Sequence, residues 1–384
     1  NQIFSKYLSK DFNTASYSLS ARTTPQQLSD FIFSQIDKRR KGVFGPPNLR
    51  KCVVHLDDVN MPMKEVWGAQ PSIEILRQLL DQKAWHVIKH GKEYLQLEDI
   101  IFAGSMVPPR VGRNEVSARF TRHFFVLPFL EFDTQTLKTI YQSILQKSFE
   151  KSNLWELKEE VVLLVEGAID VFKAVQRTLL PTPSKSHYLF NIRDLAKVIS
   201  GICLFNSSDN QRSEVWNLWQ YECIGSFGDR LADSNDIAKL QTIVKDVLKL
   251  KSDFETVSDL VYSSVPNGVY RKLESIDKII ALMTEGLAKY NAECQPKNRM
   301  NLVMFSEASL IVSRLFRILQ TPQGHVLLMG VGGSGRQSLS KLAVYMSGLH
   351  SFSIEVGRGY NISKWGEDLK KLILSSIVDN KTTG

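Results

Sequence analysis

The sequence predicts an α/β fold in which parallel sheets with flanking helices are separated by an all-helical block. Three observations lead to this prediction. Short apolar segments alternate with an amphipathic helix over about the first 130 residues, and helical spacing dominates from about residue 134 to 255. Near residue 325 an apolar segment, a glycine loop and a helix follow one another. The chain has 384 residues, so two or three folding units are expected.

The composition is that of an ordinary soluble globular protein, with 43% hydrophobic and 23% charged residues. No run of about 18 apolar residues occurs, so no transmembrane helix is expected. The four cysteines are scattered without a CxxC pair, which favours reduced thiols over a disulfide framework or a zinc site. The chain begins with Asn1 and shows no signal-peptide pattern, so we expect it to begin inside a longer protein.

The first 132 residues contain the signals of a parallel sheet. Residues 1–50 are polar and rich in loop signals, and they end at the turn signal "GPP". The helical spacing of Ile73, Leu76 and Leu79 predicts a helix over 73–82. Three apolar segments are predicted as strands, namely 51–59, 99–106 and 123–129.

The remainder of the chain is predicted to be helical first and α/β again at its end. After the helical block, "SSVPNGVY" at 263–270 is a break and a predicted linker. A helix carries Ile311 and Leu315, and "HVLLMG" at 325–330 is predicted as a buried strand. The core face of the helix after the glycine loop is predicted to consist of Leu339, Leu342, Ala343 and Met346.

The glycine loop is typical of a phosphate-binding loop because it lies between a predicted strand and a predicted helix. Glycines bring backbone N–H groups close to a phosphate, and the helix adds the positive end of its dipole. Gly330 and Gly335 fit the pattern GxxxxGK[ST], but Arg336 replaces the lysine and Gln337 replaces the Ser/Thr. The alternative is a plain glycine turn. The candidate nucleotide-binding residues are Gly330, Val331, Gly332, Gly333, Ser334, Gly335, Arg336, Gln337 and Ser338.

The segment "CVVHLDD" at 52–58 has the form of the acidic strand of an ATP site. Asp57 would orient Mg²⁺ through water, and Asp58 would polarise the attacking water, although Asp is one methylene shorter than Glu. The alternative is a turn or a helix cap. A rival carboxylate, Asp379, follows apolar residues with helical spacing, so we interpret its segment as a helix end.

The acidic strand precedes the phosphate loop, although the two parts of one ATP site normally appear in the opposite order. We therefore expect the acidic strand and the phosphate loop to belong to two different modules. The chain would be a piece of a tandem array of ATPase modules, with the first loop upstream of Asn1 and the second acidic strand downstream of Gly384.

Several motifs together resemble the dynein heavy chain, in particular the axonemal (ciliary) type. They are "RRKGVFGPP", "LDDVNMP", "WGAQPSIEILRQ", "PPRVGRNEVSARFTRHF", "HYLFNIRDLAKVISG" and "MGVGGSGRQSLSKL". The resemblance covers nearly the whole chain and implies AAA+ P-loop ATPase cores separated by a helical lid. It implies four parts: 1–132 of the third large α/β subdomain, its lid at 133–260, a linker at 261–295, and the start of the fourth large subdomain at 296–384.

The resemblance also implies roles for single residues. Asp57 and Asp58 match the acidic pair, with Asp57 on the metal and Asp58 catalytic, and Ser105 falls near the sensor of the γ-phosphate. Arg119 matches the place of an arginine finger, with Arg122 as its rival and a surface arginine as the alternative. Arg193 is a candidate second sensor on the lid. The implied cofactors are ATP or ADP with Mg²⁺.

The function implied by the resemblance is a segment of an ATP-driven motor ring that moves toward microtubule minus ends in cilia or flagella. The implied partners are neighbouring AAA+ modules, microtubules bound through a stalk outside this chain, and intermediate and light chains, without nucleic acid or membrane. The implied location is the cytoplasm, the cytoskeleton and the axoneme. This segment alone is expected to be inactive.

Two other functions remain open from the residues alone. The net charge of +8 would suit a P-loop ATPase that acts on nucleic acid, although basic and aromatic residues do not interleave. The replacements at Arg336 and Gln337 would suit a scaffold that binds nucleotide without hydrolysing it.

Overall fold

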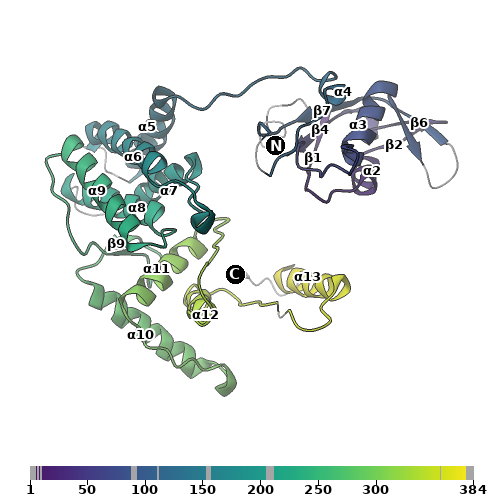
Figure 1. Cartoon of the computed structure of the whole chain (residues 1–384). Coiled ribbons are helices and arrows are strands. Elements are labelled where there is room, and N and C mark those ends of the chain that lie inside the picture. Colours follow the sequence, from purple (N-terminus) through teal and green to yellow (C-terminus); the bar gives the residue numbers. More distant parts are fainter. Residues whose placement is uncertain are drawn as a thin grey trace. The chain divides into compact units, whose positions relative to one another are not determined.

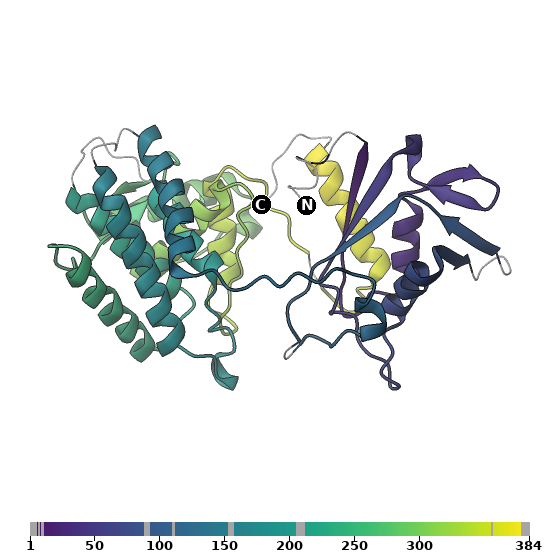
Figure 2. The same ribbon diagram turned by 90° about the horizontal axis from the view of Figure 1, so that it is seen from above.

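The computed structural model describes Lys6, Leu8 and residues 11–87, 93–109, 112–152, 157–204, 212–354 and 356–377. The chain divides into two compact units, residues 1–130 and residues 131–384 (Figure 1 and Figure 2). None of the described helices is long and apolar enough to cross a membrane.

Unit 1 contains a three-stranded parallel sheet in the order β1-β4-β7. The strand β4 lies in the middle and carries the acidic pair at its end. It pairs Asp57 with Ser18 of β1 and Leu56 with Gly104 of β7, so the carboxyl ends of the three strands meet at one edge. The bounds of the strands are β1 (Phe12–Ser18), β4 (Lys51–Asp57) and β7 (Ile100–Gly104).

A second, four-stranded sheet in unit 1 has the order β2-β3-β6-β5. Its β3 and β6 are parallel, and its other pairs are antiparallel. The basic run at 38–41 belongs mostly to β2, where Arg39 pairs with Asp99 and Arg40 pairs with Glu98. The bounds of the strands are β2 (Asp37–Arg40), β3 (Val43–Gly45), β5 (Ala84–Val87) and β6 (Glu93–Leu97).

The helices of unit 1 pack on one face of β4 because the strand alternates. Cys52, Val54 and Leu56 are buried in a cluster with side chains of the helices, whereas His55 and Asp57 point to the other face. The helices are α2 (Pro25–Phe33), α3 (Pro71–Gln82) and α4 (Ala118–Thr121), and a 3₁₀ turn η1 covers Pro47–Leu49.

Unit 2 begins with a helical bundle, as the sequence predicted, and its described residues form the helices α5 to α9. Their apolar faces share one core that includes the fully buried Trp216 and Trp219. The helices are α5 (Thr134–Lys151), α6 (Lys158–Thr178), α7 (Ile192–Cys203), α8 (Arg212–Gly228) and α9 (Ser234–Lys251), and a 3₁₀ turn η3 covers Pro183–Lys185.

A second core of unit 2 joins α10, α11 and α12. The prediction of a core face on α12 is confirmed, because Leu339, Leu342 and Ala343 are buried in this core and Met346 packs against it. The elements are β8 (Tyr262–Ser263), β9 (Arg271–Lys272), α10 (Ile276–Glu293), η4 (Pro296–Asn298), α11 (Ser306–Gln320), α12 (Arg336–Met346) and α13 (Ile362–Ile377).

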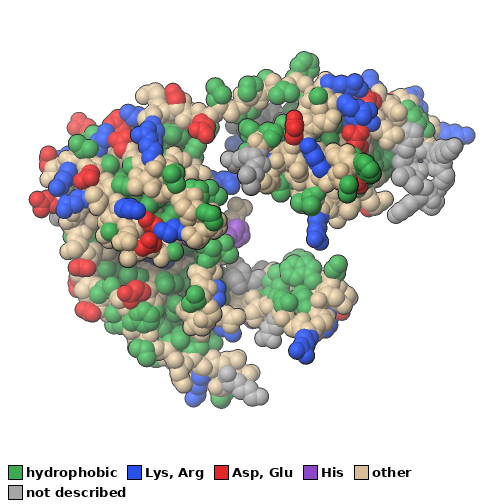
Figure 3. Space-filling view, in the orientation of Figure 1, with side chains coloured by type: hydrophobic (Ala, Val, Ile, Leu, Met, Phe, Trp, Pro, Cys, Tyr) green, Lys and Arg blue, Asp and Glu red, His purple; other side chains and the backbone are tan. Residues whose placement is uncertain are grey.

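The helix α13 buries no residue, although the sequence gives it an apolar face. The exposed apolar side chains of this helix gather on one face, green in Figure 3. The helical reading of the segment before Asp379 is confirmed up to Ile377, and Asp379 itself lies outside the described residues.

Four predictions about local structure are wrong. Residues 123–129 and 325–330 are not strands, because neither segment has a neighbouring strand among the described residues to pair its N–H and C=O groups. Their apolar side chains are exposed, with Phe125 at 100% and Leu327 at 84%. Residues 1–50 are more ordered than predicted, since they hold β1, α2, β2 and β3. The linker at 261–295 is instead the hairpin β8–β9 followed by α10, and Tyr262 and Tyr270 anchor it in the core.

Candidate functional site

Asp57 and Ser105 lie together at the carboxyl edge of the parallel sheet. They come from neighbouring strands, and the Ser105 N–H donates to the Leu56 carbonyl at 2.9 Å, which extends the pairing of β4 with β7. The Ser105 hydroxyl donates to Asp57 Oδ1 at 2.5 Å. The structure therefore brings together two residues that the sequence analysis assigned to one ATP site.

His55 is a third member of this polar group, and the sequence analysis did not find it. Its Nε2 lies 3.2 Å from the Ser105 hydroxyl, and its Nδ1 lies 3.3 Å from the hydroxyl of Ser16. The signal was available in the alternation of β4, because His55 and Asp57 are two residues apart and share a face.

Asp57 stays ionised because its surroundings favour the charged form. The hydrogen bond from Ser105 is the largest cause that lowers the pKa of Asp57. Burial, the second-largest effect, opposes it, and the Asp58 N–H, His55 and Arg113 lower the pKa further. Asp57 therefore offers an ionised carboxylate, which is the form that coordinates a cation.

Asp58 turns away from Asp57 at the end of the strand. Its backbone has φ +56°, in the left-handed region, and its N–H donates to Asp57 Oδ1 at 3.0 Å. Its own Oδ1 accepts a hydrogen bond from Arg113 Nη1 at 2.7 Å. The motif "PPRVGRNEVSARFTRHF" contains Arg113 but does not by itself indicate this contact.

The residues at this edge fit Mg²⁺ only as part of a larger ligand set. Asp57 offers carboxylate oxygen, which is the ligand type that Mg²⁺ prefers. The described residues contain no group of three or more His, Cys, Asp or Glu that could hold a metal ion. Mg²⁺ would therefore need further oxygens from water and nucleotide phosphates, as is usual for this ion.

The structure distinguishes the two candidates for an arginine finger. Arg122 is engaged, since its Nη2 lies 2.6 Å from Asp81 Oδ1. Arg119 is exposed on α4, and no ion pair of its side chain occurs among the described residues. Its backbone N–H is capped by the Ser117 hydroxyl at 3.2 Å.

The glycine loop has the backbone that a phosphate loop requires, although the strand before it does not form. Gly333 and Gly335 have φ of +81° and +79°, which favours glycine strongly. Gly335 is the N-cap of α12, and no side chain caps the helix there. The first N–H groups of α12 are thus not used by the helix and can bind an anion. The Arg336 guanidinium donates to the Val331 carbonyl at 3.2 Å.

The loop borders a hollow of about 1530 Å³. The hollow is lined by the end of α11, by residues 321–328, by the loop and α12, and by residues 349–354. Two cations, Arg336 and Lys341, belong to the lining, and no Asp or Glu is among the described residues that line it. Its electrostatic character therefore suits a polyanion such as a nucleotide.

Arg193, the candidate second sensor, stands exposed in the first turn of α7. The start of the helix is fixed by a capping box, in which the Asp194 side chain accepts from the Asn191 N–H at 3.0 Å and the Asn191 side chain accepts from backbone N–H groups of the first turn. Arg230 holds this end by an ion pair with Asp194 and a hydrogen bond of 2.8 Å to the Leu189 carbonyl. No ion pair of the Arg193 side chain is seen in the described part of the chain.

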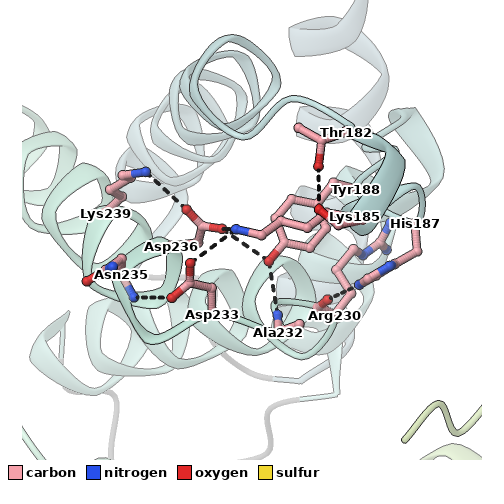
Figure 4. A network of polar contacts seen from close by, with 11 residues as sticks. Thr182, Lys185, His187, Tyr188, Arg230, Ala232, Asp233, Asn235, Asp236 and Lys239 are labelled. Carbon is pink, nitrogen blue, oxygen red and sulfur yellow. Dashed lines mark hydrogen bonds and ion pairs between the residues drawn. The ribbon is translucent and has the colours of Figure 1, made fainter.

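A second polar network fixes the segment that leads to α7 (Figure 4). Lys185 lies between two carboxylates, at 3.2 Å from Asp233 Oδ2 and 2.5 Å from Asp236 Oδ2. The Tyr188 hydroxyl donates to Asp236 Oδ2 at 3.2 Å and accepts from the Ala232 N–H at 3.0 Å. The segment 182–190, which leads to α7, is thereby attached to the start of α9.

Comparison with known proteins gives three matching family models along the chain. Residues 1–132 match the "P-loop containing dynein motor region". Residues 140–237 match the "Dynein heavy chain, ATPase lid domain", and residues 300–383 match the "P-loop containing dynein motor region D4".

Curated relatives cover almost the whole chain. Mouse dynein axonemal heavy chain 3 is 38% identical over 95% of this chain. Mouse dynein axonemal heavy chain 1 is 36% identical over 98% of it, and mouse dynein axonemal heavy chain 12 is 38% identical over 94%. The chain spans only 9% of the length of the first two relatives and 12% of the third.

Proposed function

The chain belongs to the dynein heavy chain family, and from this premise we propose that it is a segment of an ATP-driven microtubule motor ring. It contains parts of two nucleotide sites. Residues 1–132 supply the acidic side of one site, which we assign to the third AAA+ module. The loop at 330–338 supplies the phosphate side of the next, in agreement with the match of residues 300–383 to motor region D4.

The phosphate side rests on one observation above all, the backbone at Gly333 and Gly335 that opens the uncapped helix α12. We assign binding of ATP or ADP phosphates to residues 330–338, with charge supplied by Arg336. Backbone N–H groups and a helix N-terminus bind phosphate without a metal. This assignment therefore does not depend on Gln337, which stands where a Ser or Thr would hold Mg²⁺.

On the acidic side, Asp57 would hold Mg²⁺ directly or through water, and the ion would neutralise phosphate charge when bound. Ser105 donates a hydrogen bond to the carboxylate of Asp57 and would sense the terminal phosphate. Asp58 would orient the water that attacks the γ-phosphorus, in a reaction that converts ATP and water to ADP and phosphate. Arg193 on the lid would contact the nucleotide of the same site.

Arg119 would act on the neighbouring module, because its guanidinium is exposed while that of Arg122 is paired with Asp81. The partners follow from the family: adjoining AAA+ modules of the same heavy chain, microtubules reached through a stalk, and intermediate and light chains. We place the motor in the axoneme of a cilium or flagellum, moving toward microtubule minus ends, since the relatives named above are axonemal heavy chains.

The phosphate loop can be tested by titrating the chain with a fluorescent ATP analogue. Arg336→Ala should weaken binding about tenfold, because a charge-assisted hydrogen bond to phosphate contributes roughly 1.5–3 kcal/mol. Lys289→Ala is the matched control, since Lys289 is an exposed cation of α10 that pairs with Glu285 in its own helix. Equal affinities of wild type and Arg336→Ala would contradict the assignment.

A regulatory role without hydrolysis is the second candidate for the loop at 330–338. It is favoured by Gln337 and by the Arg336 guanidinium, which bonds to the loop carbonyl of Val331. Action on nucleic acid is less well supported, because Arg39 and Arg40 of the basic run are paired with acidic side chains. Nucleotide binding without turnover at this loop in the complete ring would favour the regulatory role.

A further inference from the structure

The two aspartates at the end of β4 have different partners. Asp57 is bonded to Ser105, which follows β7, whereas Asp58 is bonded to Arg113 at 2.7 Å. Neither member of the Arg113–Asp58 pair is freely exposed, because the side chains are 23% and 32% accessible. The ion pair therefore affects how Asp58 can take part in the hydrolysis proposed above.

The loop that carries Arg113 is fastened to the loop that follows Asp58. Asn114, the next residue, donates its N–H to the Asn60 carbonyl at 2.9 Å and its side-chain amide to the Pro62 carbonyl at 2.8 Å. The fully buried side chain of Asn60 donates in turn to the Val107 carbonyl at 2.5 Å. Bonds on both sides of the ion pair thus hold Arg113 against Asp58, unlike an isolated pair of long surface side chains.

This arrangement opposes the role of Asp58 in hydrolysis. A carboxylate that orients an attacking water must accept a hydrogen bond from it, and the guanidinium occupies an oxygen that would do so. The positive charge also makes the carboxylate a weaker acceptor, and the short Asp side chain has little reach to spare. Opening or rotation of the pair would free Oδ1 of Asp58 for a hydrogen bond from water.

We propose that Arg113 is a positioning residue that restrains Asp58 and keeps hydrolysis at this site slow until the pair opens. The inference rests on the proposed function of Asp58 and adds a regulatory residue to it. Arg113 and Arg119 lie six residues apart on one segment, with Asn114 anchored between them.

The test uses a complete motor heavy chain in which the other hydrolysing modules are inactivated by substitution. The affinity for a fluorescent ATP analogue and the single-turnover rate of phosphate release are measured separately. Arg113→Gln should raise the hydrolysis rate by roughly threefold or more, with the affinity within about twofold of wild type, because a freed carboxylate is a better acceptor for water. Arg113→Lys, which keeps the charge, should stay near the wild-type rate.

Arg40→Gln is the matched control, because Arg40 also forms an ion pair in unit 1 but lies on the other sheet. The gain from Arg113→Gln should vanish in the double variant with Asp58→Asn. An unchanged or reduced rate in Arg113→Gln, or a gain that persists with Asp58→Asn, would overturn the restraint. If Asp58→Asn alone left the rate unchanged, the proposed role of Asp58 would fail as well, which separates the two conclusions.

Discussion

Glu222 shows how a single buried charge constrains its neighbours. Its side chain is 1% exposed, and its Oε1 lies 2.6 Å from Arg317 Nη1 and accepts a hydrogen bond from the Tyr270 hydroxyl. The Arg317 guanidinium also stands 4.9 Å from the centre of the Tyr270 ring. An uncompensated charge at this depth would cost several kcal/mol, so these three side chains must keep their arrangement. They join α8 of the bundle to α11 within unit 2.

Gly201 on α7 is required by this arrangement. A Cβ at Gly201 would fall on the Glu222 carboxylate, whereas a Cβ at Gly225 on α8 would meet nothing within 4 Å. We expect Gly201→Ala to destabilise the chain by about 2–4 kcal/mol, because it displaces the buried carboxylate from its partners. Gly225→Ala should change stability little or raise it by about 0.5–1 kcal/mol through helix propensity. Urea unfolding monitored by tryptophan fluorescence measures the free energy of unfolding of both variants. Equal stability of Gly201→Ala and Gly225→Ala would refute the steric argument.

The ion pair of Lys185 with Asp236 should make the stability of the fold depend on pH. Lys185 is the main cause that lowers the pKa of Asp236 to about 2, and Lys239 adds to it. Because the pKa of Asp236 is lower in the folded state, its ion pair with Lys185 contributes its full stability at pH values above the ordinary pKa of 3.8. This stability is lost as the pH falls toward 2. Lys185→Met should therefore lower the melting temperature at neutral pH, and the difference from wild type should shrink between pH 4 and 2. Lys278→Met, which removes an exposed pair with Glu274, should show no such pattern.

At the scale of elements, sequence patterns were informative where a segment buries one face inside its own unit. The helix α3 and the strand β4 follow directly from their spacing, since Ile73, Leu76 and Leu56 are each 1% exposed. The segments 123–129 and 325–330 have equally apolar sequences and yet form no strand. Apolar composition shows that a segment needs a partner, but it does not show that the chain supplies one.

The helix α2 was missed, although its start carries a clear signal. Thr24 accepts from the Gln27 N–H at 3.2 Å, and the Gln27 side chain accepts from the Thr24 N–H at 3.0 Å, which is a capping box with proline at the first helical position. We expect Thr24→Ala to lower the opening free energy of α2 by about 1 kcal/mol. Hydrogen exchange of the backbone amides of residues 27–32 measures this opening free energy. Thr242→Ala on the exposed side of α9 is the control. Unchanged protection of α2 would show that packing alone holds the helix.

The sequence indicated Asp57 and Ser105 as residues of the candidate site, but their neighbours His55 and Arg113 were not predicted. Asp57 and Ser105 end apolar segments of the sequence, so a parallel sheet brings them together. The alternation of β4 also places His55 on the face of Asp57, whereas Arg113 reaches this edge only through the anchored loop around Asn114. Hydrogen bonds between segments that lie more than 50 residues apart leave no periodic mark in the sequence.

At the scale of the whole motor, Arg119 is expected to act in trans. An arginine that reaches the γ-phosphate of a neighbour stabilises charge on the transferring group. In a complete heavy chain, Arg119→Ala should lower turnover at the preceding module by at least roughly tenfold and leave the fold intact. Arg122→Ala is the matched control, because Arg122 is bound to Asp81 on α3 and should affect stability more than turnover. A loss of turnover confined to Arg122→Ala would reverse the assignment.

A polypeptide of these 384 residues alone should not hydrolyse ATP at a sustained rate. Phosphoryl transfer is catalysed by positioning and charge stabilisation, so the phosphate loop, the metal ligand and the water-orienting carboxylate must belong to one site. Asp57 and Asp58 lie at the end of β4 in unit 1, whereas the loop at 330–338 lies in unit 2 and leads into α12. Neither unit contains both halves among its described residues.

Nucleotide binding and hydrolysis should therefore separate in this polypeptide. The loop should still bind nucleotide phosphates weakly, because its N–H groups and the helix N-terminus need no metal, while phosphate release with Mg-ATP should stay at background. Arg336→Ala should reduce the binding, and Asp58→Asn should change neither quantity. Sustained turnover that both substitutions abolish would mean that Asp58 and the loop serve a single complete site, and the assignment of the two half-sites to successive modules would then be wrong.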